Sequence, residues 1–122
     1  MRYLLDTDIA VDWLRGVERA KNRVRAAAEE GLGISYITLA ELYEGVYLST
    51  DQSASERELG ELLFGLDFVP LDIETAAIFG RERAIPDLDI LIGASALRHN
   101  VTLLTNNRRD FERIEGLTIE SV

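Results

Sequence analysis

Short apolar runs alternate with helix-length segments along the whole chain, and this alternation constrains the fold more than any other feature. Strands are expected at residues 3–6, 33–36, 68–71, 101–104 and 117–120. Helices are expected at residues 7–16, 18–30, 38–48, 55–66, 72–83 and 86–99, with a short helix within 106–113. Such a pattern is typical of a parallel sheet with helices on both faces. The sequence therefore predicts an α/β, three-layer αβα fold with a mostly parallel central sheet, formed by residues 1–122 as one domain.

Polar residues and proline predict where several of these elements begin or end. Thr7 is placed to cap the helix that follows the first strand. Thr38 and Glu41 have the Ser/Thr-x-x-Glu spacing of a capping box, which stabilises a helix start without any catalytic role. Residues 50–53 form a polar break between two helices, and Pro70 places the strand at 68–71 near an edge of the sheet.

Several functional classes are excluded by composition. The chain has no cysteine, which excludes disulfides, thiolate zinc sites and cysteine nucleophiles, and His99 is its single histidine. No run of 18 apolar residues is present, and no signal peptide precedes the first strand, so we expect a cytoplasmic protein without a membrane partner. The net charge of −9 argues by itself against nucleic-acid binding. A metal ion bound by clustered carboxylates would reverse the charge locally.

Three acids stand where chemistry is expected in a parallel sheet. Asp6 ends the first strand, and because Thr7 or Asp8 could cap the next helix, Asp6 has no predicted structural role. Asp89 precedes a dense apolar run, whereas Asp87 is the natural cap of that helix. Glu41 is the third candidate. Ligands bind at the carboxyl ends of the strands in such sheets, where these acids would gather.

A fourth polar segment follows the strand at 101–104. Asp110, Asn107 and Thr105 are candidates for a further group that faces the metal, directly or through water. Mg²⁺ or Mn²⁺ takes oxygen ligands and could orient a water for in-line displacement at a phosphodiester. No protein nucleophile is then needed. Candidates to support the acids or to contact phosphate are Thr7, Thr105, Asn107, Arg15, Arg98, Arg108 and Arg109.

Four segments in order resemble the PIN-domain family, and specifically the VapC-like toxins of toxin–antitoxin pairs. They are Leu5–Asp8 with Trp13–Gly16, then residues 37–45, 89–97 and 104–111. The resemblance implies metal ligation by Asp6 and Asp89, with Glu41 in the same cluster. It also implies endonucleolytic cleavage of RNA, a homodimer, and inhibition by a cognate antitoxin. Many relatives have an acid at the position of Asn107, and most have alanine at the position of Gly93.

Other interpretations compete with this one. An Asp-x-Asp after a strand occurs in phosphatases of the haloacid-dehalogenase type, but these use a downstream lysine, and Lys21 is the only lysine here. The chain could instead be a non-catalytic PIN-like binding module, or a nuclease that acts on DNA or structured RNA. The apolar faces of the helices at 38–48 and 55–66, including Tyr47 and Leu63, are the expected surface for the dimer or the antitoxin.

Overall fold

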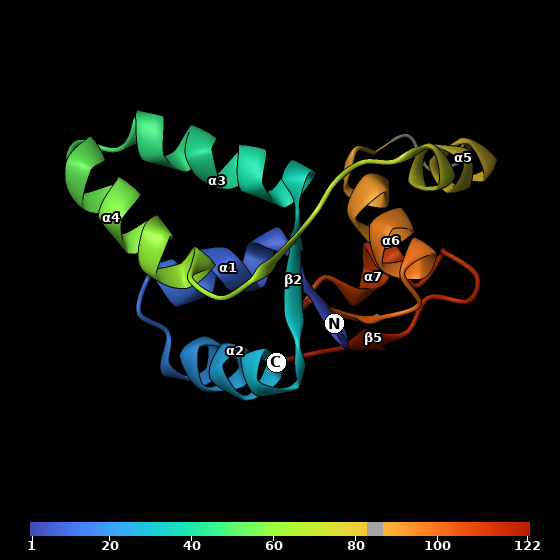
Figure 1. Cartoon of the computed structure of the whole chain (residues 1–122), viewed down its shortest axis with the longest axis horizontal. Coiled ribbons are helices and arrows are strands. Elements are labelled where there is room, and N and C mark those ends of the chain that lie inside the picture. The colour runs from blue at the N-terminus through green and yellow to red at the C-terminus, as the bar shows by residue number, and fades with distance from the viewer. Residues whose placement is uncertain (83–86) are drawn as a thin grey trace.

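A five-stranded parallel sheet forms the centre of the computed structural model, which describes residues 1–82 and 87–122 (Figure 1). Its strands are β1 (Tyr3–Leu5), β2 (Leu32–Ser35), β3 (Asp67–Val69), β4 (Thr102–Leu104) and β5 (Ile119–Glu120). They lie in the order β3-β2-β1-β4-β5, and each neighbouring pair is parallel. The predicted parallel sheet is confirmed, and β3, which directly precedes Pro70, is an edge strand as expected.

Helices cover both faces of the sheet, which Figure 1 shows nearly edge-on. On one side lie α1 (Thr7–Leu14), α2 (Glu18–Glu30), α3 (Tyr36–Leu48) and α4 (Gln52–Leu63). On the other lie α5 (Ile73–Arg81), α6 (Asp89–Arg98) and the short α7 (Arg108–Phe111). The three-layer αβα arrangement is therefore confirmed. Within the described part of the chain, no helix is both long enough and apolar enough to cross a membrane.

Each face of the sheet has its own hydrophobic core, because successive side chains of a strand point to opposite faces. Leu5 of β1 packs in one cluster with Ile9 of α1 and Leu42 of α3. Its neighbour Leu4 packs in the other cluster, where Ile92 of α6 is also fully buried. The strands thus read as continuous apolar runs, as expected for a sheet covered on both sides.

Helix starts differ from the prediction where polar residues stand side by side. The cap of α1 is Asp6 and not Thr7, since the Asp6 carboxylate accepts the Thr7 N–H at 2.8 Å. The cap of α3 is Ser35, whose hydroxyl accepts the Thr38 N–H at 3.1 Å. The capping box predicted for Thr38 and Glu41 is therefore wrong, because α3 already begins at Tyr36.

The bounds of α4 also differ from the prediction. Asp51 caps α4, so the polar break expected at residues 50–53 is the start of the helix. That helix ends at Leu63, and Gly65 follows with φ of +80°, a conformation that favours glycine and stops the helix before Leu66. The ends predicted at residues 83 and 86 for the next two helices lie outside the described residues.

Strand register brings three polar residues to one edge of the sheet. Leu5 pairs with Ile34 of β2 on one side and with Leu104 of β4 on the other. Asp6, Ser35 and Thr105 therefore come next on the three central strands, or directly after them. The chain continues from β1 to one side of the sheet and returns at β4 on the other, which makes this edge a topological switch point.

Candidate active site

Asp6 stands at the centre of the candidate site, between α1 and the end of β4. Its side chain is only 5% exposed. One carboxylate oxygen accepts the Thr7 N–H, and the other accepts the Thr105 hydroxyl at 2.7 Å. Burial raises the pKa of Asp6 to about 7, the two hydrogen bonds lower it, and the charge of Asp8 adds to the increase. Asp6 thus caps α1, a role that the sequence did not reveal. Burial also disfavours its charged form, and a bound cation would offset this cost.

Glu41 reaches the same edge from the second turn of α3. Its Oε1 accepts a hydrogen bond from the Thr7 hydroxyl at 2.8 Å. Because Ser35 caps α3, the Glu41 carboxylate has no role at the helix start and points to the neighbouring strand end instead. Thr7, predicted as a supporting residue, contacts both Asp6 and Glu41.

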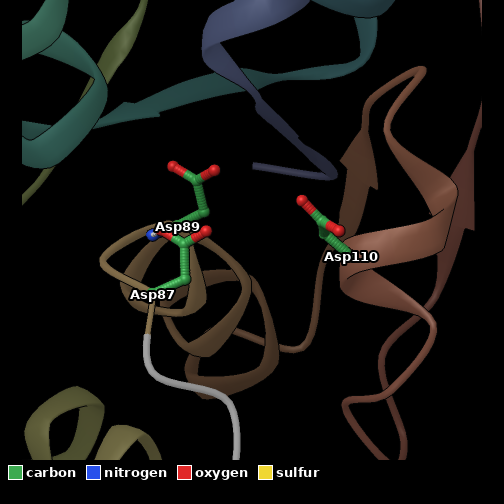
Figure 2. A group of neighbouring side chains, drawn as sticks. All are labelled: Asp87, Asp89 and Asp110. Atoms are coloured by element: carbon green, nitrogen blue, oxygen red, sulfur yellow. Dashed lines mark hydrogen bonds between the residues drawn. The ribbon is translucent and has the colours of Figure 1, made fainter.

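Three further acids meet where α6 and α7 approach each other (Figure 2). One carboxylate oxygen from each of Asp87, Asp89 and Asp110 lies within 4.8 Å of the other two. Asp6 and Glu41 are not part of this trio. The pKa of Asp89 is raised, first by burial and then by the charges of Asp87, Glu41, Asp110 and Asp8. The charge of Glu41 therefore acts on Asp89. We call Asp6, Glu41 and the trio together the acidic cluster.

The loop after β4 holds the trio and Asp6 together. The Thr105 hydroxyl, fully buried, donates to Asp6 and accepts the Asn107 N–H at 2.9 Å. The side-chain amide of Asn107 donates to Asp110 at 3.0 Å. Thr105 and Asn107 are thus well placed for the supporting roles predicted for them, because each fixes the orientation of an acid.

Two acids join the cluster that sequence reasoning assigned to other roles. Asp8, interpreted as a possible cap of the first helix, accepts the Asn106 N–H at 3.0 Å across the edge of the sheet. Asp87, interpreted as a helix cap, accepts the Asp89 N–H at 3.1 Å but also belongs to the trio. The Asp-x-Asp spacing of Asp6 with Asp8 and of Asp87 with Asp89 could have indicated this. In each pair one acid can cap the helix, which leaves the other acid available for the site.

The candidate arginines are spread more widely than the acids. Arg108 is directed toward β5, where it donates to the Ile119 carbonyl at 3.4 Å. Arg98 pairs with Asp72 at 3.2 Å, at the end of α6 opposite Asp89. Only Arg15 lines a groove with Glu41, so it is the phosphate-binding candidate with the most suitable position. Arg109 is exposed.

Gly93 lies inside α6, one turn from Asp89, at a point of close packing. A Cβ atom built there would lie 2.5 Å from Cδ1 of Ile114 and 3.1 Å from Phe111. Ile114 therefore occupies the space that an alanine methyl would need. The glycine serves the packing of the helix, although it lowers its intrinsic propensity.

These features define a parallel α/β domain with an all-oxygen, acidic site at its switch point. Carboxylates without sulfur or imidazole donors suit a hard divalent cation. Residues 3–117 match the PIN domain family, and the chain therefore belongs to that family.

Known relatives within the family are VapC ribonucleases. The chain is 30% identical to Ribonuclease VapC2 of Rickettsia felis, over 99% of this chain and 98% of that protein. It is 27% identical to the tRNA(fMet)-specific endonuclease VapC of Shigella flexneri, over 98% and 97% of the two chains. The crystal structure of VapBC2 from Rickettsia felis bound to a DNA fragment from their promoter matches with a TM-score of 0.91 and 30% identity, over 100% and 99% of the chains. The resemblance inferred from the four motifs is confirmed.

Proposed function

We propose that this protein is a Mg²⁺- or Mn²⁺-dependent endoribonuclease toxin that hydrolyses RNA phosphodiester bonds and is neutralised by a cognate antitoxin. The observation that carries the proposal is the hydrogen-bond network of Thr7, Thr105 and Asn107, which joins Glu41, Asp6 and Asp110 at one edge of the sheet. Asp89 lies next to Asp110 there. The ribonuclease names of the relatives support RNA as the substrate class.

Asp6, Glu41 and Asp89 would hold the metal ion, with Asp110 beside them. Burial is the main cause of the raised pKa of both Asp6 and Asp89, and the charge of Glu41 adds to the increase at Asp89; a bound cation would offset these costs and stabilise the site. When bound, a divalent ion supplies a deprotonated water and stabilises charge on the oxygens of an in-line displacement.

The protein's own groups orient the acids and admit the substrate. Thr7 and Thr105 hold the two oxygens of Asp6 from opposite sides. Asn107 donates its side-chain amide to Asp110, whose carboxylate lies near those of Asp87 and Asp89. Arg15, beside Glu41, is the basic group that would meet a phosphate next to the cleaved bond.

An apolar groove beside the acids is our proposed site for the antitoxin. It has a volume of about 230 Å³ and is lined mostly by α1, α3 and α4, including Leu14, Glu41 and Val46. A partner segment in this groove would block access to Glu41. Tyr47 on α3 is 64% exposed, as expected for a partner surface, whereas Leu63 is partly buried against the core.

A homodimer is also part of the proposal. Exposed apolar side chains occur from β3 to the start of α5, where Phe68 is 47%, Leu71 48% and Ile73 86% exposed. Apolar surface of this kind is typical of a region covered by another chain.

Cleavage of purified RNA tests the function. Wild-type protein should cleave total cellular RNA with Mg²⁺ or Mn²⁺ and lose this activity in EDTA. Asp6→Asn and Asp89→Asn should each abolish cleavage, while Asp67→Asn on the exposed edge strand is the matched control and should retain it. Cleavage that survives EDTA and both substitutions would refute the proposed site. Absence of cleavage by the wild type under every metal condition would favour a non-catalytic binding module.

A further inference from the structure

The hydroxyl groups of Ser35, Thr38 and Thr7 form a series of hydrogen bonds from the protein interior to Glu41. The Ser35 hydroxyl lies 3.3 Å from that of Thr38, which lies 3.1 Å from that of Thr7. The Thr7 hydroxyl lies 2.8 Å from Oε1 of Glu41. Ser35 and Thr38 are buried, with 1% and 0% exposure, so water does not compete for their hydroxyl groups. This series connects the end of β2 with the residue that follows Asp6.

The direction of each hydrogen bond follows from the number of protons. An ionised carboxylate accepts only, so the Thr7 hydroxyl must donate its one proton to Glu41. The contact between Thr7 and Thr38 then needs the proton of Thr38, and the contact between Thr38 and Ser35 needs that of Ser35. The Thr38 N–H donates to the Ser35 oxygen, which leaves the Ser35 proton free for Thr38. All three hydroxyl protons therefore point toward Glu41.

We propose that Thr38 is a positioning residue, which acts through the Thr7 hydroxyl to orient the Glu41 carboxylate for metal binding. This inference rests on the proposed metal-dependent function and names a residue that supports it without touching metal or substrate. Thr7 also donates its N–H to Asp6. A fixed Thr7 thus sets the relative position of two acids, of which Asp6 follows β1 and Glu41 lies on α3.

Removal of the Thr38 hydroxyl would leave the Thr7 oxygen without its donor. Thr7 would then be free to rotate, and Glu41 would lose its fixed orientation. Groups that orient metal ligands in this way typically change metal affinity by about 10- to 100-fold when they are removed. We expect Thr38→Val, which keeps the side-chain shape, to weaken Mn²⁺ binding by about 10-fold. Thr38→Ser keeps the hydroxyl and should retain the wild-type affinity.

The test is the dissociation constant for Mn²⁺, measured by calorimetry on the full chain, beside RNA cleavage by the same samples. The set comprises wild type, Thr38→Val, Thr38→Ser, Thr7→Val and the double variant Thr7→Val/Thr38→Val. Thr75→Val is the matched control, because Thr75 is also fully buried and hydrogen-bonded, but to Asp72 at the start of α5. Circular dichroism on each variant, which reports folding, separates a lost fold from a lost orientation.

The double variant decides whether Thr38 acts through Thr7. We expect it to bind Mn²⁺ as weakly as Thr7→Val alone, because one interaction cannot be lost twice. Wild-type affinity in Thr38→Val, or equal loss in Thr38→Ser and Thr38→Val, would overturn the inference while leaving the proposed function intact. Losses that multiply in the double variant would also overturn it. A wild-type protein that neither binds Mn²⁺ nor cleaves RNA would overturn the proposed function and this inference together.

Discussion

Asp6→Asn should stabilise the metal-free protein at neutral pH, although the same change should abolish cleavage. Asparagine can keep both hydrogen bonds of the aspartate. Its carbonyl oxygen can accept the Thr7 N–H, and its amide can donate to the Thr105 oxygen, whose own proton can turn toward Asp8, 3.4 Å away. What the substitution removes is the ionisation of a buried carboxyl group.

The magnitude follows from the pKa of Asp6, which rises from 3.8 to about 7 on folding. The folded protein therefore binds a proton more tightly than the unfolded chain does. Its free energy of unfolding falls as the pH rises from about 4 to about 7, and stays low above that range. Each pH unit corresponds to about 1.4 kcal/mol, so the loss is on the order of 4 kcal/mol. Asp6→Asn lacks this loss.

Urea unfolding in EDTA, followed by circular dichroism at several pH values, measures the difference between variant and wild type. The variant should gain about 4 kcal/mol relative to the wild type between pH 4 and pH 8, since the other titrating groups are shared. Mg²⁺ at about 100 times its dissociation constant should return about 2.7 kcal/mol to the wild type but little to the variant. If the difference in free energy of unfolding between variant and wild type does not change with pH, folding does not raise the pKa of Asp6 and the reasoning is refuted.

Three further predictions concern the packing and the surroundings of the site. Gly93→Ala should lower the free energy of unfolding by roughly 1 kcal/mol, because overpacking against Ile114 outweighs the gain in helix propensity. Urea unfolding should show that Ile114→Val, which removes the atom at 2.5 Å, cancels this loss in the double variant. Thr105→Val should reduce RNA cleavage about 10-fold, whereas Thr105→Ser should retain it; equal rates would contradict the role of that hydroxyl. Gly45→Leu fills open space in the groove beside the acids, so cleavage should continue in the presence of a co-expressed antitoxin. Full neutralisation of this variant would exclude the groove as the antitoxin site.

The sequence was sufficient to predict the layers, the parallel sheet and the principal acids. Buried parallel strands are short apolar runs, and polar residues directly after them can only lie at the carboxyl edge. Asp6 and Thr105 were placed at this edge in this way. Their grouping needed no side-chain detail, because the backbone alone brings the strand ends together.

The roles of adjacent polar residues could not be predicted in the same way. Ser35 and Thr38 both favour a helix start, and only the backbone conformation at Ser35 decides that it is the cap. The same ambiguity assigned Asp8 and Asp87 to the helices alone. Long side chains raise a different difficulty, because Arg108 can reach several partners and its contact with β5 depends on where the last strand lies.

The order of the strands has a consequence for the time at which the protein becomes active during synthesis. β4 pairs with β1 at the centre of the sheet, yet it is made after most of the chain, and Thr105 and Asp110 follow it. Asp6, among the first residues made, therefore lacks its buried hydrogen-bond partner until the last segment joins the sheet. A growing chain on the ribosome holds only part of the acidic cluster. The proposed site is therefore complete only after the segment that follows β4 has been made and has joined the sheet.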